Sequence, residues 1–222
     1  MPDNANPPSP HAAPPFGPKD VEILNRQVAF DGFFRLTRYQ VKHRLYAGGW
    51  SAALQREVLE RAPCIALLPY DPLRDRVVMI EQFRLPAHLA ARPAWQLEII
   101  AGIIEADATA EASVHKEAQE EAGLEVKTLE RICRYMPSAG GCTENIDLFI
   151  GGVDSRGATG LFGRSDEGED IRAITLETDE AVALIDQGRI QQSAALIALL
   201  WLKSARSRLR ESWLDPHQRS RY

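Results

Sequence analysis

Three glutamates near the middle of the chain have the spacing of a metal or acid–base site. Glu117, Glu120 and Glu121 lie within the segment KEAQEEAG, at positions i, i+3 and i+4, which a helix places on one side. Such a face is commonly solvated surface, because glutamate forms helices well. It can also bind a hard cation, since Mg²⁺ takes carboxylate oxygens together with substrate phosphates. Spacing alone leaves both interpretations open.

The segments around these glutamates favour the metal site. Residues 95–102, WQLEIIAG, predict a strand that ends at Gly102, and a short acidic loop separates this strand from the helix. Gly123 follows the helix directly and predicts its end. The acidic face should therefore lie beside a strand end and a loop, where ligand sites are often built. Asp107 and Thr109 are both candidates for the N-cap of the helix.

This stretch resembles the Nudix box, G-x5-E-x7-R-E-U-x-E-E-x-G-U, in which U is aliphatic. The residues in register are Gly102, Glu117, Ala118, Glu120, Glu121, Gly123 and Leu124. Two positions depart from the motif, because Ala108 replaces its first glutamate and Lys116 replaces its arginine. In the family these two residues typically form an ion pair that braces the loop on the helix. We interpret the departure as structural, with Asp107 as a candidate partner for Lys116.

The composition is that of an ordinary globular protein. With 222 residues, 45% of them hydrophobic and 26% charged, the chain can bury one good core. The net charge of −5 gives no argument for nucleic acid, and the basic residues at 203–210 fit the solvated end of an apolar helix better. Three widely spaced cysteines without a CxxC pair predict reduced thiols and a cytoplasmic location. No signal-peptide pattern and no apolar run of about 18 residues is present, so we expect neither export nor a membrane span.

Composition and turn signals divide the chain into four parts. The early strand-like segments are separated by turn signals at Asp31-Gly32 and at residues 47–49, as in an antiparallel meander. A sheet of this size is marginal alone, so it should pack on something larger. The expected parts are a proline-rich disordered tail at 1–18, an N-terminal β-sheet dimerisation domain at 19–61, a domain carrying the box at 62–213, and a C-terminal tail at 214–222.

Strands and helices alternate within the third part. The expected strands are 63–71, 76–84, two strands joined by a glycine-rich loop with Ser138 and Glu144, and 170–177; the expected helices are 178–187 and 193–209. The last helix, with Ser193 as its N-cap, is apolar nearly all round, which predicts deep burial. Residues 157–169 form a long acidic loop without periodicity, and such loops are either functional or disordered. The fold class is therefore α/β or α+β, with a mixed sheet between helices.

From about Asp20 to Trp213 the chain resembles, more narrowly, bacterial ADP-ribose pyrophosphatases, through FFRL, LLPYDP, IEQFR, LEIIAGIIE and EGEDIR among other segments. The resemblance implies a Nudix-type α/β/α sandwich and a homodimer that exchanges its N-terminal sheet. It implies Mg²⁺, with Mn²⁺ as an alternative, bound by Glu117, Glu121, Glu169 and the Ala101 carbonyl, with Glu120 as a further ligand. It implies Glu167 as the general base. The implied substrate-binding residues are Phe33, Phe34, Arg56, Glu57, Arg61, Arg84, Ile103, Ser138 and Glu144.

The activity implied by this resemblance is Mg²⁺-dependent hydrolysis of ADP-ribose to AMP and ribose 5-phosphate. Splitting a pyrophosphate requires neutralisation of phosphate charge, a positioned water and a base near it, and the retained glutamates suit these needs. Three alternatives stay open, one of which is a structural protein with an acidic face. Another is a different nucleotide substrate, such as GDP-mannose, another nucleotide sugar or a dinucleotide polyphosphate. The third is a sensor that binds ADP-ribose without cleaving it, because the box lacks its acid at Ala108. No nucleic-acid or membrane partner is expected.

Overall fold

The structure is a computed structural model that describes residues 15–214, without the side chain of Glu167. The described chain forms two compact units, and each is considered by itself. The first unit ends at Arg61 and also includes Gly140–Thr143, while the second begins at Ala62. Apart from residues 15–18 and 214, the two expected tails lie outside the described residues.

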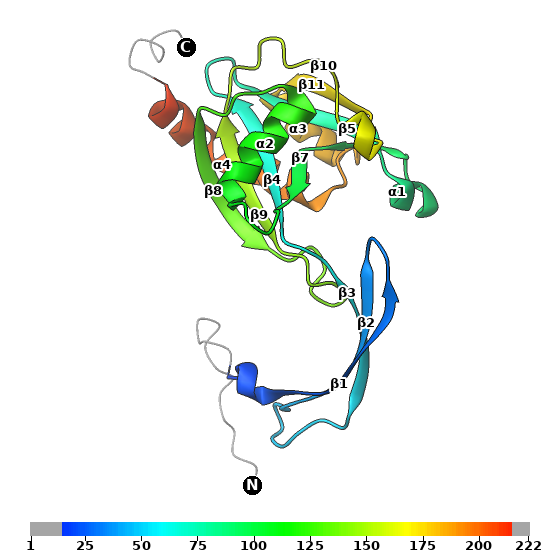
Figure 1. The fold of residues 1–222 in the computed structure, drawn as a ribbon. Coiled ribbons are helices and arrows are strands. Elements are labelled where there is room, and N and C mark those ends of the chain that lie inside the picture. The colour runs from blue at the N-terminus through cyan, green and yellow to red at the C-terminus, as the bar shows by residue number, and fades with distance from the viewer. Residues whose placement is uncertain (1–14, 215–222) are drawn as a thin grey trace. The chain divides into compact units, whose positions relative to one another are not determined.

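The first unit is a three-stranded antiparallel sheet, as the turn signals predicted. Its strands are β1 (Val21–Asp31), β2 (Arg35–His43) and β3 (Leu54–Glu60), paired in the order β1-β2-β3 (Figure 1). A 3-10 helix, Pro18–Asp20, precedes them. All of β1 is exposed, and Thr37 is the only buried residue among those described in this unit. The sheet therefore has no core of its own, which fits the marginal stability expected of three strands.

The second unit is built on an eight-stranded mixed sheet. Its main path runs β10-β11-β5-β4-β9-β8, in which β4 and β9 are parallel and the other neighbours antiparallel. Two short strands lie off this path, with β6 paired to β5 and β7 to β4. The bounds are β4 Cys64–Asp71, β5 Arg76–Phe83, β6 Trp95–Glu98, β7 Ile100–Ile103, β8 Thr128–Tyr135, β9 Ile146–Gly152, β10 Gly160–Phe162 and β11 Ile171–Glu177.

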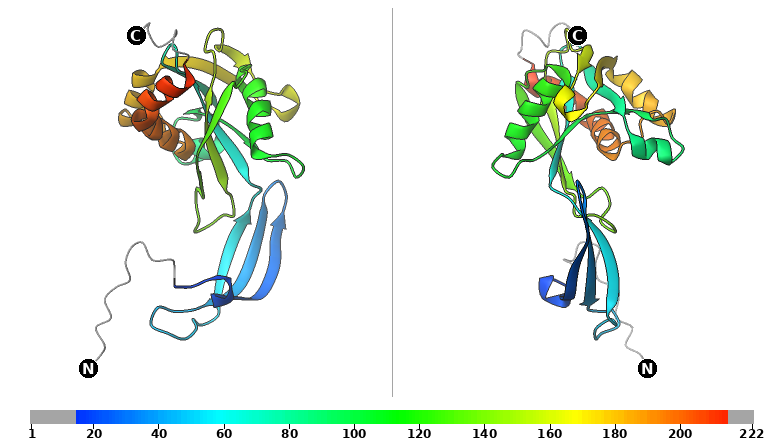
Figure 2. Two further views of the ribbon diagram at one scale, coloured as in Figure 1. Left: turned by 90° about the vertical axis from the view of Figure 1, so that its left-hand side faces the viewer. Right: turned by 45° about the vertical axis from the view of Figure 1, so that its right-hand side comes forward.

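Helices cover both faces of this sheet, as Figures 1 and 2 show. Helix α2 (Ala110–Ala122) packs on one face, and α3 (Thr178–Asp186) with α4 (Ser193–Trp213) packs on the other. Strand β4 shows the reason, because Ile65 and Leu67 belong to the α2 core while Leu68 and Tyr70 belong to the α4 core. Successive side chains of a strand point to opposite faces, so a run that is apolar throughout fills both cores. The expected α/β/α sandwich with a mixed sheet is confirmed.

Two segments differ from the sequence expectation. The strand expected at 95–102 is two strands, because the chain leaves its partner β5 and joins β4 at Ile99. The loop expected at 157–169 contains β10 and a 3-10 helix, Ser165–Glu167. A strand of three residues is too short to show an alternating pattern, and its pairing with β11 is a long-range contact. The short helix α1 (Leu85–Leu89) was not expected for the same reason of length.

The last helix also differs in detail from the expectation. Ser193 is its first helical residue rather than its N-cap, which is Gln192, and no side chain caps this end. The helix is buried on one side only, because Leu199 and Leu202 are fully buried while Leu200 is 54% exposed. The expected burial against the sheet is therefore found on the side of α4 that faces the sheet, while the opposite side is exposed.

All three cysteines have free thiols, with Cys64 buried and Cys133 and Cys142 half-buried. Within residues 15–214, none of the helices reaches the combination of length and hydropathy that crossing a membrane requires.

Candidate active site

Helix α2, which carries the acidic residues, is anchored at both ends. The Thr109 hydroxyl accepts a hydrogen bond at 3.1 Å from the backbone N–H three residues on, so Thr109 is the N-cap, the second of the two candidates. Gly123 ends the helix in the left-handed region with φ 62°, a conformation that glycine adopts without strain. Val114, Ala118 and Ala122 on one side of the helix pack against the sheet.

Two glutamates of α2 reach strand β7. Glu121 is only 3% exposed, and its Oε2 accepts a hydrogen bond from the Ala101 N–H at 3.2 Å. The carboxylate of Glu117 lies against Gly102, where an added Cβ would overlap it. The glycine of the motif is therefore needed so that this carboxylate can approach the backbone. Glu120 is half-buried, and its backbone carbonyl accepts a hydrogen bond from the Gly163 N–H at 3.2 Å.

The electrostatics of this group are dominated by the burial of Glu121 beside other carboxylates. Burial raises the pKa of the Glu121 carboxyl to about 8, against the opposing effect of the Ala101 N–H. The charges of Glu117 and Glu169 raise that pKa further, while Arg84 lowers it. A divalent cation bound here would relieve the repulsion, and carboxylate and carbonyl oxygens are the donors that Mg²⁺ prefers. The donor set therefore fits such a cation.

The carboxylates are not, however, drawn together at ligand distances. Among the described side chains, no three Asp, Glu, His or Cys groups converge closely enough to hold an ion. Instead, Glu121 accepts the Ala101 N–H and Glu169 Oε2 accepts the Arg164 N–H at 3.1 Å. Each of these hydrogen bonds engages one oxygen of its carboxylate, so the second oxygen can still contact an ion.

The loop before β11 is fastened to α2. The Gly163 N–H donates to the Glu120 carbonyl at 3.2 Å, and the Glu169 N–H donates to the Arg164 carbonyl at 3.0 Å. The charge of Glu169 acts on both Glu121 and Arg84. Glu167 ends the 3-10 helix of this loop, and its side chain is outside the described part of the chain.

Arg84, expected as the last residue of the strand at 76–84, directly follows β5 and is paired with a glutamate that the sequence analysis did not single out. Its Nε lies 3.1 and 3.2 Å from the two carboxylate oxygens of Glu98, and its Nη2 lies 2.8 Å from Oε2. Burial alone would lower the pKa of Arg84, but the Glu98 carboxylate outweighs burial and raises it. Glu98 is the one charged residue in the otherwise uncharged strand segment WQLEII, and that contrast was the available signal.

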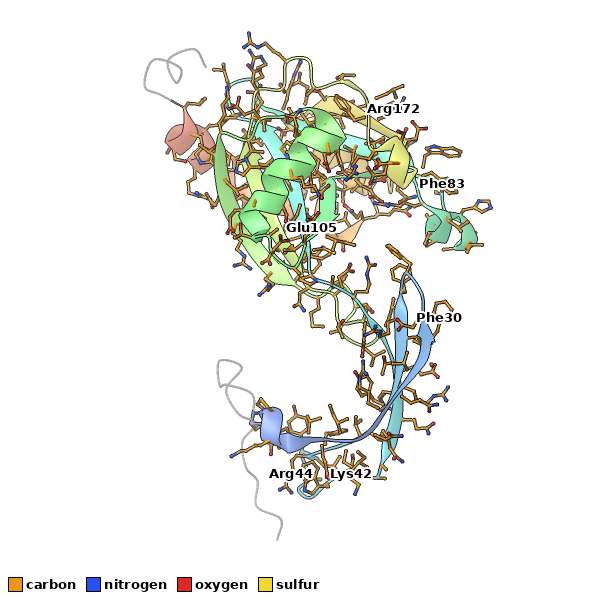
Figure 3. The ribbon with its side chains drawn as sticks, viewed as in Figure 1. Phe30, Lys42, Arg44, Phe83, Glu105 and Arg172 are labelled. Carbon is orange, nitrogen blue, oxygen red and sulfur yellow. The ribbon has the colours of Figure 1, made fainter. Side chains whose placement is uncertain are left out.

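Lys116 also has a partner that differs from the expected one. Its Nζ lies 2.7 Å from Glu105 Oε1, in the loop that joins β7 to α2 (Figure 3). Asp107 is therefore not its partner. The Ala108 N–H donates to the Glu105 carbonyl at 3.1 Å, so a tight turn precedes the helix. Lys116 thus pairs with Glu105, which lies three residues before Ala108, the position of the first glutamate in the Nudix box.

The other expected residues of the second unit are less tightly placed. Ile103 ends β7 and is 45% exposed, and Ser138 is exposed in a turn after β8. Glu144 is half-buried, and its Oε1 lies 3.4 Å from the Cys64 thiol, which donates to it.

The expected aromatic residues belong to the first unit. Phe33 and Phe34 lie in the turn between β1 and β2, with ring centroids 4.9 Å apart, and Phe33 is 84% exposed. The Arg61 guanidinium stacks over Phe34 at 4.9 Å. On β3, Arg56 donates to the Gln55 carbonyl, and Glu57 forms an ion pair at 2.8 Å with Arg38. The structure thus brings together three of these five residues: Phe33, Phe34 and Arg61.

A cavity of about 300 Å³ lies elsewhere in the second unit, at the end of β4 that is remote from β7. Its lining includes Asp71, Arg74, Lys127, Arg156 and Trp213. None of the residues expected to bind metal or substrate lines it. The carboxylate group on α2, and not this cavity, is therefore the candidate active site.

Comparison with known proteins agrees with this geometry. The family model of the NUDIX domain matches residues 60–194, the stretch that holds the carboxylates of α2, Arg84 and Glu169. The chain belongs to the NUDIX domain family. The ADP-ribose pyrophosphatase of Escherichia coli (strain K12) is 40% identical over 198 residues, which cover 89% of this chain and 95% of that protein. The one from Haemophilus influenzae is 39% identical over 201 residues, covering 89% and 93%.

Other NUDIX relatives have a different substrate in their names. The GDP-mannose pyrophosphatase of Citrobacter koseri is 35% identical over 189 residues, covering 83% of this chain and 96% of that protein. Among solved structures, the crystal structure of an ADP compounds hydrolase superposes with a TM-score of 0.64 over 83% of this chain and 95% of the other. At 14% identity this likeness concerns the fold alone.

Proposed function

We propose that this NUDIX protein hydrolyses the pyrophosphate bond of ADP-ribose, so that ADP-ribose and water give AMP and ribose 5-phosphate. The observation that carries the proposal is the burial of Glu121 beside Glu117 and against β7, in register with the box. The names of the relatives at 40% and 39% identity support ADP-ribose as the substrate.

We assign the metal site to Glu117, Glu121, Glu169 and the Ala101 carbonyl, with Glu120 as a further ligand. Mg²⁺ is the proposed ion and Mn²⁺ the alternative; when bound, it would neutralise phosphate charge and polarise the bond to be broken. The Ala101 N–H orients Glu121 at 3.2 Å, and Gly102 leaves room for Glu117. These contacts from β7 support a fixed placement of both carboxylates.

We assign the role of general base to Glu167, which would take a proton from the attacking water. It lies between Arg164 and Gly168, in a loop that hydrogen bonds to α2 through Gly163. A loop glutamate suits this role, because the loop can close after the substrate binds and exclude bulk water. Arg84 would bind a phosphate of the substrate, with Ser138, Ile103 and Glu144 contacting its ribose and phosphates.

We assign adenine recognition to the first unit. Phe33 and Phe34 present exposed rings beside the Arg61 guanidinium, and an exposed aromatic face can stack on a base. Arg56 and Glu57 would complete this site. The exposed apolar side chains of β1, among them Ile23 and Phe30, support a homodimer in which the N-terminal sheet is exchanged, because a sheet without a core needs a partner surface.

The second candidate substrate is GDP-mannose, which the 35% identity to the Citrobacter koseri protein favours. The catalytic chemistry would be the same, and the base-binding residues would decide between the two. A receptor that binds ADP-ribose without cleaving it is less well supported, since all the acidic residues assigned above are present and Lys116 has Glu105 as a partner. The three free thiols support a reducing, cytoplasmic location.

The proposed function is tested with purified protein and Mg²⁺ against a panel of nucleotide substrates, with products separated by chromatography. The panel contains ADP-ribose, GDP-mannose, UDP-glucose, NADH and diadenosine polyphosphates. AMP released fastest from ADP-ribose is the expected result. Binding of ADP-ribose by calorimetry without any cleavage would overturn the hydrolase and leave the receptor.

A further inference from the structure

Glu98 is a buried acid to which none of the proposed catalytic steps gives a role. It lies on β6 and is 5% exposed. A buried carboxylate is unfavourable unless it is paired and hydrogen bonded, and here the partner is Arg84, which directly follows the neighbouring strand β5. Buried ion pairs add little to stability when compared with apolar residues of similar size. A role other than stability therefore needs consideration.

The geometry of the pair leaves part of Arg84 available. Glu98 accepts hydrogen bonds from Nε and Nη2 of Arg84, the closest at 2.8 Å. This side-on arrangement engages two neighbouring donors and fixes the plane of the guanidinium. Within residues 15–214, Nη1 has no hydrogen-bond partner, and the Arg84 side chain is 43% exposed. The free donors are thus presented to the outside in one fixed orientation.

Glu98 is itself held from a third element. The Gln192 Nε2 donates to Glu98 Oε2 at 3.4 Å, and the Gln192 Oε1 accepts the Ile99 N–H at 3.4 Å. Gln192 is the N-cap residue of α4, and its side chain makes no capping hydrogen bond to that helix. The backbone of Arg84 is fixed as well, because its N–H donates to the Ala94 carbonyl at 2.7 Å. Gln192 therefore fixes the Glu98 carboxylate, and Ala94 fixes the backbone of Arg84.

We infer that Glu98 is a positioning residue, which holds the Arg84 guanidinium beside Glu121 and Glu169 so that its free donors meet a substrate phosphate. Glu98, which holds the guanidinium, lies three residues before Ala101, whose N–H binds the Glu121 carboxylate at 3.2 Å. The charges of Glu121 and Glu169 also act on Arg84. The inference rests on the proposed function. Glu98 acts only through Arg84 and does not touch the reacting atoms.

A double-mutant cycle on the full-length protein tests this role. Glu98→Gln keeps the shape of the side chain and removes its charge, and we expect kcat/KM for ADP-ribose to fall roughly 10-fold to 100-fold. Arg84→Ala should lower kcat/KM at least as much. In the Arg84→Ala background, Glu98→Gln should change kcat/KM less than about 2-fold, because residues that act as one unit are not additive. It should also raise Tm in that background, since it removes an unpaired buried charge.

The matched control is Glu177→Gln. Glu177 of β11 pairs with Arg76 at the other end of β5, with Nε 2.8 Å from its carboxylate, so it repeats the arginine–glutamate pair away from the site. Its substitution should leave kcat/KM unchanged. Gln192→Ala is the second variant, and it spares the ion pair; we expect a roughly 2-fold to 5-fold fall in kcat/KM without loss of Tm.

Each outcome of the cycle decides the inference. Additive losses for Glu98→Gln and Arg84→Ala would overturn it, because Glu98 would then act independently of Arg84. If Glu98→Gln does not fold, the Gln192→Ala variant decides, and unchanged kcat/KM there overturns the positioning role. A wild-type chain that does not cleave ADP-ribose would instead overturn the proposed function, and the inference with it.

Discussion

Replacing Glu121 by glutamine should stabilise the metal-free fold and remove the response of the protein to Mg²⁺. Glu121 is 3% exposed, and burial together with Glu117 and Glu169 raises the pKa of its carboxyl from 4.5 to about 8. A glutamine at this position still accepts the Ala101 N–H through its amide oxygen, but carries no charge. The variant therefore removes the free-energy cost of a buried ionisable carboxyl while keeping the local hydrogen bond.

The size of the effect follows from linkage between protonation and folding. For an acid whose pKa is raised on folding, stability is complete below the unfolded value of 4.5 and is lost as the pH rises toward the folded value. One pKa unit corresponds to about 1.4 kcal/mol, so the metal-free wild type should lose about 3 kcal/mol between pH 4 and pH 7 at this group. Glu121→Gln should be more stable than wild type by up to about that amount at pH 7, or roughly 6–10 °C in Tm.

The assay is thermal unfolding in EDTA and then in excess Mg²⁺, at several pH values between 4 and 8. In EDTA the stability advantage of Glu121→Gln should grow with pH, and in Mg²⁺ it should shrink, because a bound ion stabilises only the wild-type site. Turnover with Mg²⁺ should fall by at least about 100-fold in the variant. Glu125→Gln, the same chemical change at an exposed position after the helix, is the control and should leave both quantities unchanged.

Two results would refute this reasoning. A variant that is less stable than wild type in EDTA at pH 7 would mean that burial of the Glu121 carboxyl does not destabilise the metal-free fold. A variant with the wild-type response to Mg²⁺ would remove Glu121 from the metal site.

Three further predictions follow from other parts of the structure. Glu167→Gln should lower kcat by roughly 100-fold to 10,000-fold while ADP-ribose binding by calorimetry is retained; unchanged turnover would remove it from the role of base. Ala108→Glu with Lys116→Arg should raise Tm by roughly 1–4 °C. Activity should change little, because Lys116 already forms an ion pair with Glu105. A large gain in activity would show that the natural box is catalytically impaired. Asp75→Asn should cost roughly 3 kcal/mol at pH 7, because Asp75 is bound by Arg206 and Tyr70. Burial opposes ionisation of Asp75, but these partners outweigh it and lower its pKa, so denaturant titrations should show the loss above pH 4 and its disappearance toward pH 2.

Features with a local pattern were predicted from the sequence. Residues 63–71 are apolar throughout, and β4 fills both cores of the second unit. The spacing of Glu117, Glu121 and Gly123 predicted a helix with an acidic side and a glycine stop, and α2 has both.

Features that depend on long-range pairing were missed. The Arg84–Glu98 pair exists because β6 pairs with β5 in a register that sets Ile80 opposite Glu98, and the single predicted strand through Ile99 hid this pairing. The Lys116–Glu105 pair depends on the path of the loop, which spacing does not define. Strand β10 is recognisable only through its partner β11. In each case the signal lay in a residue or segment distant along the chain.

The central claim is that this NUDIX protein is an ADP-ribose pyrophosphatase, and its most direct test compares kcat/KM for ADP-ribose and GDP-mannose in the same Mg²⁺ buffer. Products are identified by chromatography, with EDTA as the metal-free control. The structure and its relatives predict AMP and ribose 5-phosphate, a preference for ADP-ribose, and no turnover in EDTA. A higher kcat/KM for GDP-mannose, or cleavage that persists in EDTA, would contradict the claim.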